Sequence, residues 1–448
     1  MASADATAAP ESMLIRGAHL TDPCTGVDGV RDVAVSGGLV ARVDERIDPG
    51  EVHASRVMDA EGLWLWPGLV DVHVHFREPG FTHKETIQTG SAAAMRGGYT
   101  SVVCEPNTQP PLEGPELAQQ MHLKALAVSR VRVYFKATMT RGRQGTEPGD
   151  YESLAEVPWV VALSDDGDPV VSAAVMEEVC RRASRSGLLL SPHCEDSPRA
   201  LDGYRAGLDP GFEPGEPYTN EAGYVARDLE LARRAGARIH FSHVSLGGSV
   251  ELIKRARLGR PEAGVTFEVT PHHLLLSGSS FAPGEVPRVC PPLRSGKDLE
   301  ALQRALEGGE VDAVASDHAP HSSEERRAGA SGLIGLETTL GLMLTHFVHA
   351  GRLSRLGAAA ALSTGPARAF RLPGGSLAVG QPADMVLIDP DEEWVVDSGE
   401  FASLSRNTPY EGWRMRGRAA ATVVGGEVVF SLPSLEGRMK GWDREAAI

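Results

Sequence analysis

The sequence predicts an α/β protein, a (β/α)8 barrel of the TIM type with a small β-sandwich domain built from both ends of the chain. Three observations predict this fold class. In the middle of the chain, short apolar runs alternate eight times with longer stretches of helical character. Segments with a β pattern flank this region on both sides. The 448 residues are enough for a barrel of roughly 250 residues and a second domain.

The two flanking regions, residues 1–66 and 371–448, contain short apolar bursts broken by Gly, Asp and Pro. Such bursts are typical of short strands joined by turns. The N-terminal ones are Met13–Ile15, Val33–Val35, Leu39–Val43 and Val57–Asp59, and the C-terminal ones are Asp384–Ile388 and Ala421–Phe430. A Gly/Pro-rich link, Leu372–Pro382, marks the boundary before the second region. We expect both regions to pair into one sandwich beside the barrel.

Residues 67–370 should form the barrel. The eight strands that we expect are Leu69–His75, Tyr99–Glu105, Val131–Thr138, Val160–Asp165, Leu188–His193, Ala237–His243, Val265–Thr270 and Val311–Ser316. They are nearly continuous apolar runs, as expected where both faces of a parallel sheet are buried. The clearest helices between them are Lys84–Arg96, Val170–Ser186, Glu221–Ala235 and Lys297–Leu306.

Composition and charge narrow the class of protein. The net charge of −16 disfavours a nucleic-acid partner, which needs a basic face. No apolar run approaches the roughly 18–20 residues that span a bilayer, and the N-terminus does not resemble a secretory signal. The chain has an odd number of cysteines, and no two of them form a CxxC pair. Both observations favour a protein of the reducing cytoplasm over one held by disulfide bonds. The cysteines are Cys24, Cys104, Cys180, Cys194 and Cys290.

Histidines and aspartates stand at the carboxyl ends of the expected strands, where barrel enzymes build their active sites. Strand one ends in Asp71-Val-His73-Val-His75, and alternate residues of a strand point the same way. One inward histidine is more often a structural core residue, but two at this spacing favour a metal site. His193 and His243 end the fifth and sixth strands, and Asp166 and Asp317 directly follow the fourth and eighth.

Imidazoles and carboxylates together suit Zn²⁺ or a similar divalent ion. There are more candidate ligands than one tetrahedral ion needs, so a two-metal site with a bridging carboxylate and hydroxide fits better. Asp317 could then take a proton from the hydroxide and return it to a leaving nitrogen. Such a site hydrolyses an amide or, in reverse, condenses one.

A series of motifs from about residue 60 to 415 resembles the class I dihydroorotases of the amidohydrolase superfamily. The motifs are Asp71-Val-His-Val-His-Phe-Arg-Glu-Pro-Gly80, Pro106-Asn-Thr108, Asp165-Asp-Gly167, His193-Cys-Glu-Asp196, Glu268-Val-Thr-Pro-His-His273, Pro291-Pro-Leu-Arg294, Ser316-Asp-His-Ala-Pro-His321 and Asn407-Thr-Pro-Tyr-Glu-Gly412. They occur in the family's order, and the set is far more specific than the paired histidines alone.

The resemblance implies a role for each matching residue. The metal ligands would be His73, His75, Asp166, His193, His243 and Asp317. Asp166 would bridge two Zn²⁺ ions, where many relatives use a carboxylated lysine, and Asp317 would be the catalytic residue. The substrate would be bound by His75, Arg77, Asn107, Cys290, His321, Ser331 and Gly332. Of these, Arg77, Asn107 and His321 would hold its carboxylate, to which arginine offers a planar pair of donors. The family also implies a homodimer and a possible association with aspartate transcarbamoylase.

Three departures from the family affect the rim of the site. Cys290 replaces the Asn that contacts the substrate ring, Glu105 replaces a Met, and Ala330-Ser-Gly332 replaces Pro-Phe-Gly. Two alternatives therefore stay open. One is another cyclic amidase, of the dihydropyrimidinase, hydantoinase or allantoinase kind, whose substrates lack the carboxylate. The other is a non-catalytic subunit that supports a transcarbamoylase.

Other residues near these motifs admit two interpretations each. Lys136 could be a carboxylated bridging lysine, although a solvated or ion-paired lysine is favoured because Asp166 is available. For His272 and His273, lining the pocket and structural hydrogen bonding are both open, and a structural role is favoured for His318. The loop Pro320–Gly332 is a candidate mobile cover for the site.

Overall fold

The computed structural model describes residues 12–195, 221–258, 264–282 and 285–442; the N-terminal stretch 1–11 and the motif residue Asp196 lie outside them. Its centre is a barrel of eight parallel strands in sequential order. They are β6 (Leu69–Val74), β7 (Tyr99–Cys104), β8 (Arg132–Thr138), β9 (Val160–Ser164), β10 (Leu189–Leu190), β11 (Ile239–Phe241), β12 (Val265–Val269) and β13 (Ala313–Val314). A parallel bridge between Val74 and His318 joins the first strand to the segment after the last. The predicted barrel is confirmed.

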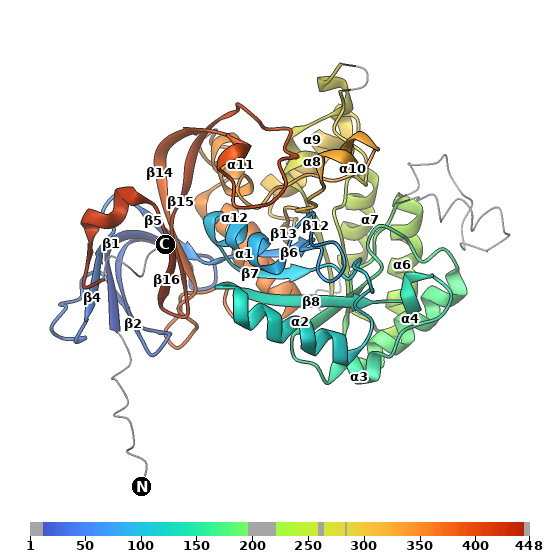
Figure 1. Cartoon of the computed structure of the whole chain (residues 1–448), viewed down its shortest axis with the longest axis horizontal. Helices are drawn as coiled ribbons and strands as arrows, with labels where there is room; N and C mark the ends of the chain where they lie inside the picture. Colours follow the sequence, from blue (N-terminus) through green and yellow to red (C-terminus); the bar gives the residue numbers. More distant parts are fainter. Residues whose placement is uncertain (1–11, 196–220, 259–263, 283–284, 443–448) are drawn as a thin grey trace, which may run out of the picture.

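Helices cover the outside of the barrel (Figure 1). They are α1 (Ile87–Arg96), α2 (Pro115–Val128), α3 (Tyr151–Ala155), α4 (Ala173–Ser186), α6 (Glu221–Ala235), α7 (Gly247–Arg257), α8 (Pro271–Leu275), α9 (Gly296–Glu307), α10 (Ser323–Arg327), α11 (Thr339–Met343), α12 (Arg355–Ala359) and α13 (Gly365–Phe370). All four helices predicted by range are present. Two of them begin three residues later than predicted, because the side chains of Thr86 and Ser172 cap α1 and α4.

The small domain is a nine-stranded mixed sheet made from both ends of the chain. Its strands are β1 (Ser12–Asp22), β2 (Val27–Ser36), β3 (Leu39–Asp44), β4 (Arg56–Asp59), β5 (Trp64–Pro67), β14 (Met385–Val395), β15 (Arg414–Val424), β16 (Glu427–Ser431) and β17 (Met439–Lys440). C-terminal β14 pairs with N-terminal β5, and β5 pairs with β1, which confirms that the two ends combine. Figure 1 shows this sheet beside the barrel.

Two details of the small domain differ from the sequence prediction. The segment Ala421–Phe430 is a hairpin rather than one strand, because Gly425 and Gly426 adopt φ of 57° and 82° and reverse the chain between β15 and β16. Strand β5 was not predicted, because Trp64–Pro67 directly precedes the first barrel strand. Only Gly68 separates the two strands.

Gly68 is the junction between the small domain and the barrel. Its N–H donates to Asp384 O (2.9 Å), and its carbonyl accepts from Ser363 Oγ (2.7 Å). A Cβ at this position would lie 2.2 Å from Thr100 Oγ1, so only glycine fits there. Separate apolar cores lie in the barrel and in the small domain. The boundaries after residues 66 and 370 stay predictions.

Two further observations concern the whole chain. Among the residues that the structure describes, no helix has the length and apolar character needed to cross a bilayer. All five cysteines carry unpaired thiols, and Cys24 is the one that is exposed.

Candidate active site

The six predicted metal-binding residues gather at the carboxyl end of the barrel strands. His73 belongs to β6, and His75, Asp166, His193, His243 and Asp317 follow β6, β9, β10, β11 and β13. All six side chains are buried. The structure brings them together because the carboxyl ends of parallel barrel strands share one face of the barrel.

Asp166 lies at the centre of the histidines. Its Oδ1 is 3.4 Å from His73 Nε2, His193 Nδ1 and His243 Nε2. Its Oδ2 is 3.6 Å from His75 Nε2. Burial opposes ionisation of Asp166, but the His73 charge and the histidine hydrogen bonds outweigh it and lower its pKa well below the ordinary value. An ionised carboxylate placed among four imidazoles suits a bridging position.

Asp317 faces the two histidines of the first strand. Its Oδ1 lies 3.2 Å from His75 Nε2 and 3.7 Å from His73 Nε2. Burial raises the pKa of Asp317, but the His75 hydrogen bond and the neighbouring imidazoles lower it by more. Asp317 is therefore an ionised carboxylate.

The donor atoms fit divalent cations. His73, His75 and Asp317 form one group whose ligand atoms all lie within 4.8 Å of one another, and His73, Asp166 and His243 form a second. His73 Nε2 is buried and has no hydrogen-bond partner, which is costly for an imidazole nitrogen. It lies 3.4 Å from Asp166 Oδ1 and 3.7 Å from Asp317 Oδ1, and a cation bound among these atoms would satisfy it, because Zn²⁺ accepts imidazole nitrogen and carboxylate oxygen as ligands.

Residues behind these ligands orient them. Glu268 Oε1 accepts from His73 Nδ1 (2.6 Å), its Oε2 lies 2.9 Å from His240 Nε2, and Oε1 also accepts from the His243 N–H (3.2 Å). A carboxylate on Nδ1 leaves the Nε2 lone pair of His73 free for a metal. The sequence analysis assigned no role to Glu268. The available signal was a single charged residue inside the otherwise uncharged strand β12.

Asn107 links two of the predicted ligands. Its Oδ1 accepts from His75 Nδ1 (2.9 Å), and its Nδ2 donates to Asp166 Oδ2 (3.0 Å). The sequence analysis expected Asn107 to contact the substrate. In the structure both ends of its amide side chain are bonded to the metal-binding cluster.

Three non-glycine residues at the strand ends have positive φ. They are Arg77 (59°), His243 (33°) and Asp317 (46°). Such backbone costs of order 1 kcal/mol or more for a residue with a Cβ, and it clusters at functional sites. Because β6 ends at Val74 and the chain turns at Arg77, this side chain does not continue the alternation of the strand.

Arg77 and His321 form a pair beside the histidine–aspartate cluster. Arg77 Nη2 lies 3.2 Å from His321 Nε2, and Arg77 Nε donates to Pro320 O (3.2 Å). Burial lowers the pKa of Arg77 to about 10, so the guanidinium stays charged at neutral pH. Burial and the charge of Arg77 lower the pKa of His321 to about 4, so its imidazole is neutral. A buried cation with a neutral imidazole suits an anionic group of a ligand.

Cys290, Ser331 and Gly332 are the remaining predicted substrate residues. Cys290 Sγ lies 3.6 Å from His193 Nε2, so its side chain reaches the cluster. Gly332 has φ of 140°, and a Cβ there would lie 2.7 Å from Ala319 and 3.3 Å from His321. Ser331 is exposed. The structure thus places Gly332 against His321 and Cys290 against a predicted metal ligand.

The structure also shows the contacts of the residues for which the sequence left two roles open. Lys136 is fully buried, forms an ion pair with Glu105 and donates to Ser191 Oγ (2.9 Å), so it is ion-paired and not solvated. His273 bonds to Thr270 Oγ1 and Pro291 O, a structural arrangement. His318 is structural as well, because its Nδ1 accepts from the Gly335 N–H and its Nε2 lies 3.3 Å from Glu85.

His272 is the other histidine of this motif. Its Nε2 is buried without a hydrogen-bond partner, and burial lowers its pKa to about 4, so its imidazole is neutral.

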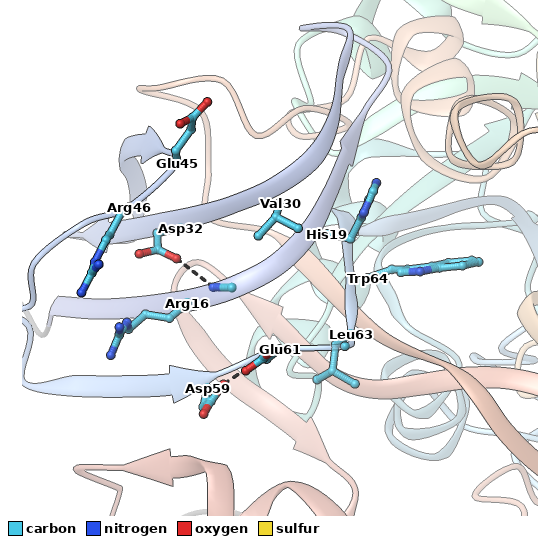
Figure 2. A pocket seen from close by; sticks show the side chains of 12 residues that line it. Arg16, His19, Val30, Asp32, Glu45, Arg46, Asp59, Glu61, Leu63 and Trp64 are labelled. Carbon is cyan, nitrogen blue, oxygen red and sulfur yellow. Dashed lines mark hydrogen bonds between the residues drawn. The ribbon is translucent and has the colours of Figure 1, made fainter.

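A separate hollow of about 570 Å³ lies on the small domain (Figure 2). Its walls carry charges of both signs, including Arg16, Asp32, Arg46 and Glu61, beside Trp64. Asp32 is already bonded to the backbone N–H groups of residues 17 and 47. All lining residues belong to the small domain, so this hollow is not part of the histidine–aspartate cluster.

Comparisons with known proteins agree with this geometry. Residues 64–429 match the amidohydrolase family. A dihydroorotase of Anaeromyxobacter sp. (strain K) is 41% identical over 93% of this chain and 97% of its own length. A dihydroorotase of Pelotomaculum thermopropionicum is 39% identical over 93% of this chain and 98% of its own.

Among solved structures, the L-hydantoinase (dihydropyrimidinase) from Arthrobacter aurescens is similar, with a TM-score of 0.81 and 27% identity over 94% of this chain and 96% of that one. The barrel, the cluster at its carboxyl end and these likenesses agree with one another. The chain is therefore a hydrolase acting on cyclic amides, and it belongs to the dihydroorotases of the amidohydrolase family.

Proposed function

We propose that this protein is a zinc-dependent dihydroorotase, which interconverts N-carbamoyl-L-aspartate and L-dihydroorotate in pyrimidine synthesis. The observation that carries the proposal is the pair formed by buried Arg77 and half-buried His321 beside the histidine–aspartate cluster. It supplies a carboxylate-binding group next to a centre suited to amide hydrolysis. The two relatives at about 40% identity, both dihydroorotases, support it.

Two Zn²⁺ ions held by His73, His75, Asp166, His193, His243 and Asp317 would lower the pKa of a water and polarise the amide carbonyl. Asp317, which is ionised and lies beside His75, accepts the proton of the attacking water and delivers it to the leaving ring nitrogen. In the direction of ring closure, the same carboxylate takes the proton from the carbamoyl nitrogen.

The remaining residues hold the substrate. Arg77 offers a planar charged group to the ring carboxylate, and neutral His321 stands beside it. By the family resemblance, Asn107 would share in binding this carboxylate, and the backbone of Ser331 and Gly332 would contact the ring. Cys290 occupies the position beside His193 where the family's Asn contacts the ring.

The test is hydrolysis of L-dihydroorotate by the zinc-loaded protein, beside dihydrouracil and hydantoin, with Arg77→Ala as the variant. We expect activity on dihydroorotate and a loss of about 100-fold or more in kcat/KM in Arg77→Ala, because a charged hydrogen-bonded anchor disappears. Arg141→Ala is the matched control, since Arg141 is exposed and forms a surface ion pair with Glu147. Equal loss in both variants, or activity on the neutral rings alone, would contradict the proposal.

A hydantoinase-like activity on neutral rings is the second candidate, favoured by the structural likeness to the Arthrobacter aurescens enzyme and by Cys290. It fits less well, because a neutral ring would leave the buried Arg77 charge without an anionic partner. The non-catalytic subunit is tested by metal analysis. Two equivalents of zinc per chain support the enzyme, and none in carefully purified protein supports the scaffold.

We also propose that the protein works in the cytoplasm as a homodimer, which could associate with an aspartate transcarbamoylase. The unpaired thiols of all five cysteines support a reducing compartment. Light scattering of the purified protein, alone and mixed with the transcarbamoylase of the same organism, measures both assemblies. A monomeric mass in both samples would contradict them.

A further inference from the structure

The connection between β14 and β15, residues 396–413, extends from the small domain toward the barrel loop that contains α10 (Figure 1). This loop runs from Ala319 to Leu333 and carries His321 and Gly332, two of the proposed substrate residues. Ser405 and Asn407 of the connection are both buried against it, with 4% and 1% of their surfaces exposed.

Hydrogen bonds from these two residues reach both ends of the loop. Ser405 Oγ donates to His321 O (2.7 Å) and accepts from the His321 N–H (3.2 Å). Asn407 Nδ2 donates to Gly332 O (2.9 Å) and to Ala319 O (3.3 Å). Asn407 Oδ1 also lies against Ser405 Oγ, whose single proton it shares with His321 O. One pair of polar side chains therefore ties the beginning of the loop to its end.

The tied residues are the ones that surround Arg77. The loop supplies Pro320 O, which accepts from Arg77 Nε, and His321 Nε2, which lies 3.2 Å from Arg77 Nη2. Gly332 lies against His321, where a Cβ would come within 3.3 Å of its ring. The position of the guanidinium thus depends on a loop segment whose backbone is held by Ser405 and Asn407, together with the bonds from the Ala319 N–H to Leu333 O (2.6 Å) and from the Gly332 N–H to Arg288 O (2.8 Å).

We propose that Ser405 and Asn407 are positioning residues of the carboxylate site, through which the small domain sets the affinity of the barrel for its anionic substrate. The inference rests on the proposed function. Neither residue touches the reacting atoms. Each acts through His321, Pro320 and Gly332 on the orientation of Arg77.

The consequence is specific in kinetic terms. A looser Arg77 weakens binding of the carboxylate in the ground state and the transition state alike, which raises KM and leaves kcat nearly unchanged. A displacement of about 1 Å in a positioned group can cost up to about 100-fold, so a tenfold increase in KM is the expected order. A merely structural role would instead lower thermal stability or the amount of active enzyme.

The experiment compares Asn407→Ala, Asn407→Asp and Ser405→Ala with Asp397→Ala in the zinc-loaded full chain. Asp397 lies in the same connection, is exposed and caps the turn at residue 399, without a contact to the loop. The measurements are KM and kcat for L-dihydroorotate, hydrogen–deuterium exchange of residues 319–334, melting temperature and zinc content.

We expect Asn407→Ala and Asn407→Asp to raise KM about tenfold with kcat within about threefold, and to accelerate exchange in residues 319–334. Asp397→Ala should match the wild type. Unchanged KM and exchange in the Asn407 variants overturn the inference, and so does a loss of kcat at unchanged KM. If Asn407→Ala does not fold, Ser405→Ala decides by the same criteria.

Exchange separates this inference from the proposed function. A wild type without dihydroorotase activity overturns the proposed function and, with it, the assignment of a carboxylate site. In that case hydrogen–deuterium exchange alone tests the loop contacts. Faster exchange in the variants would then show that Ser405 and Asn407 hold the loop in place, without a role in substrate binding. An active wild type with unaltered Asn407 variants overturns the positioning role and leaves the proposed function intact.

Discussion

At the scale of single residues, Glu268 shows how a buried acid can orient a candidate metal ligand without being a ligand itself. Its two carboxylate oxygens bond to His73 Nδ1, His240 Nε2 and the His243 N–H. Burial raises the pKa of Glu268, but the charge and hydrogen bond of His73 and the bond from His240 lower it by more, so the carboxylate is ionised. It therefore sets which nitrogen of His73 faces the cluster.

We predict that Glu268→Gln lowers zinc affinity by about 10- to 100-fold, the usual effect of removing a carboxylate behind a ligating histidine. The amide keeps the size of the side chain but removes its charge. Competition with a zinc-sensitive chelator dye measures the affinity. Glu251→Gln, on the exposed side of α7, is the control. Zinc binding as tight as in the wild type would show that Glu268 does not orient His73.

At the scale of elements, the neighbouring strands β7 and β8 enclose an ion pair inside the barrel. Glu105 directly follows β7 and Lys136 lies in β8, and both side chains are fully buried. Burial lowers the pKa of Lys136, but the Glu105 charge raises it by more, so the ammonium stays protonated. Ser191 Oγ and the ring face of Phe370 complete its surroundings. Two charges inside a barrel are tolerated because they compensate each other.

A double-mutant cycle tests this pair. Lys136→Met alone should lower the free energy of unfolding by about 3–5 kcal/mol, because it removes the ammonium paired with the buried Glu105 carboxylate, which also lies 3.5 Å from His73 Nε2. Glu105→Met with Lys136→Met should recover most of that loss, since apolar side chains of similar length replace both charges. Urea unfolding of the zinc-loaded protein measures the effect. Additive losses in the double variant would refute the coupling.

At the scale of the whole molecule, the connection 396–413 joins the small domain to the barrel through a buried carboxylate. Glu337, between β13 and α11, accepts from the N–H groups of Ala402 (3.0 Å) and Ser403 (3.3 Å). Burial raises its pKa to about 7, although these hydrogen bonds lower it. Glu85 bonds to the same Ser403 and to His318, so this contact reaches the strand end that carries Asp317.

The sign of the pH effect follows from linkage. The folded protein holds a proton on Glu337 more tightly than the unfolded chain, so this contribution to stability is complete below about pH 4.5 and is lost as pH rises toward 7. We predict that the wild type loses roughly 1–3 kcal/mol of unfolding free energy between pH 5 and pH 8 that Glu337→Gln keeps, because the amide does not titrate. Urea unfolding at the two pH values measures this. An identical pH dependence in both proteins would contradict it.

Individual residues show how much of the fold and of the candidate site the sequence could predict. The strands and the gathering of six histidines and aspartates at their ends were predictable because apolar runs and strand ends are local features of the chain. Glu268 was missed because its partner His73 lies 195 positions away in the sequence. Asn407 was recognised as part of a motif, but its hydrogen bonds to Ala319 and Gly332 became visible only once the small domain was placed against the barrel.

The sequence by itself determined the barrel, the small domain built from both ends and the set of residues at the strand ends. It could do so because alternation, turn residues and motif spacing act over a few positions. Only the tertiary structure decided that Arg77 turns out of its strand toward His321, that Lys136 pairs with Glu105 and that Ser405 and Asn407 tie the loop. These contacts join residues from distant parts of the chain, and which buried groups meet depends on how every element packs.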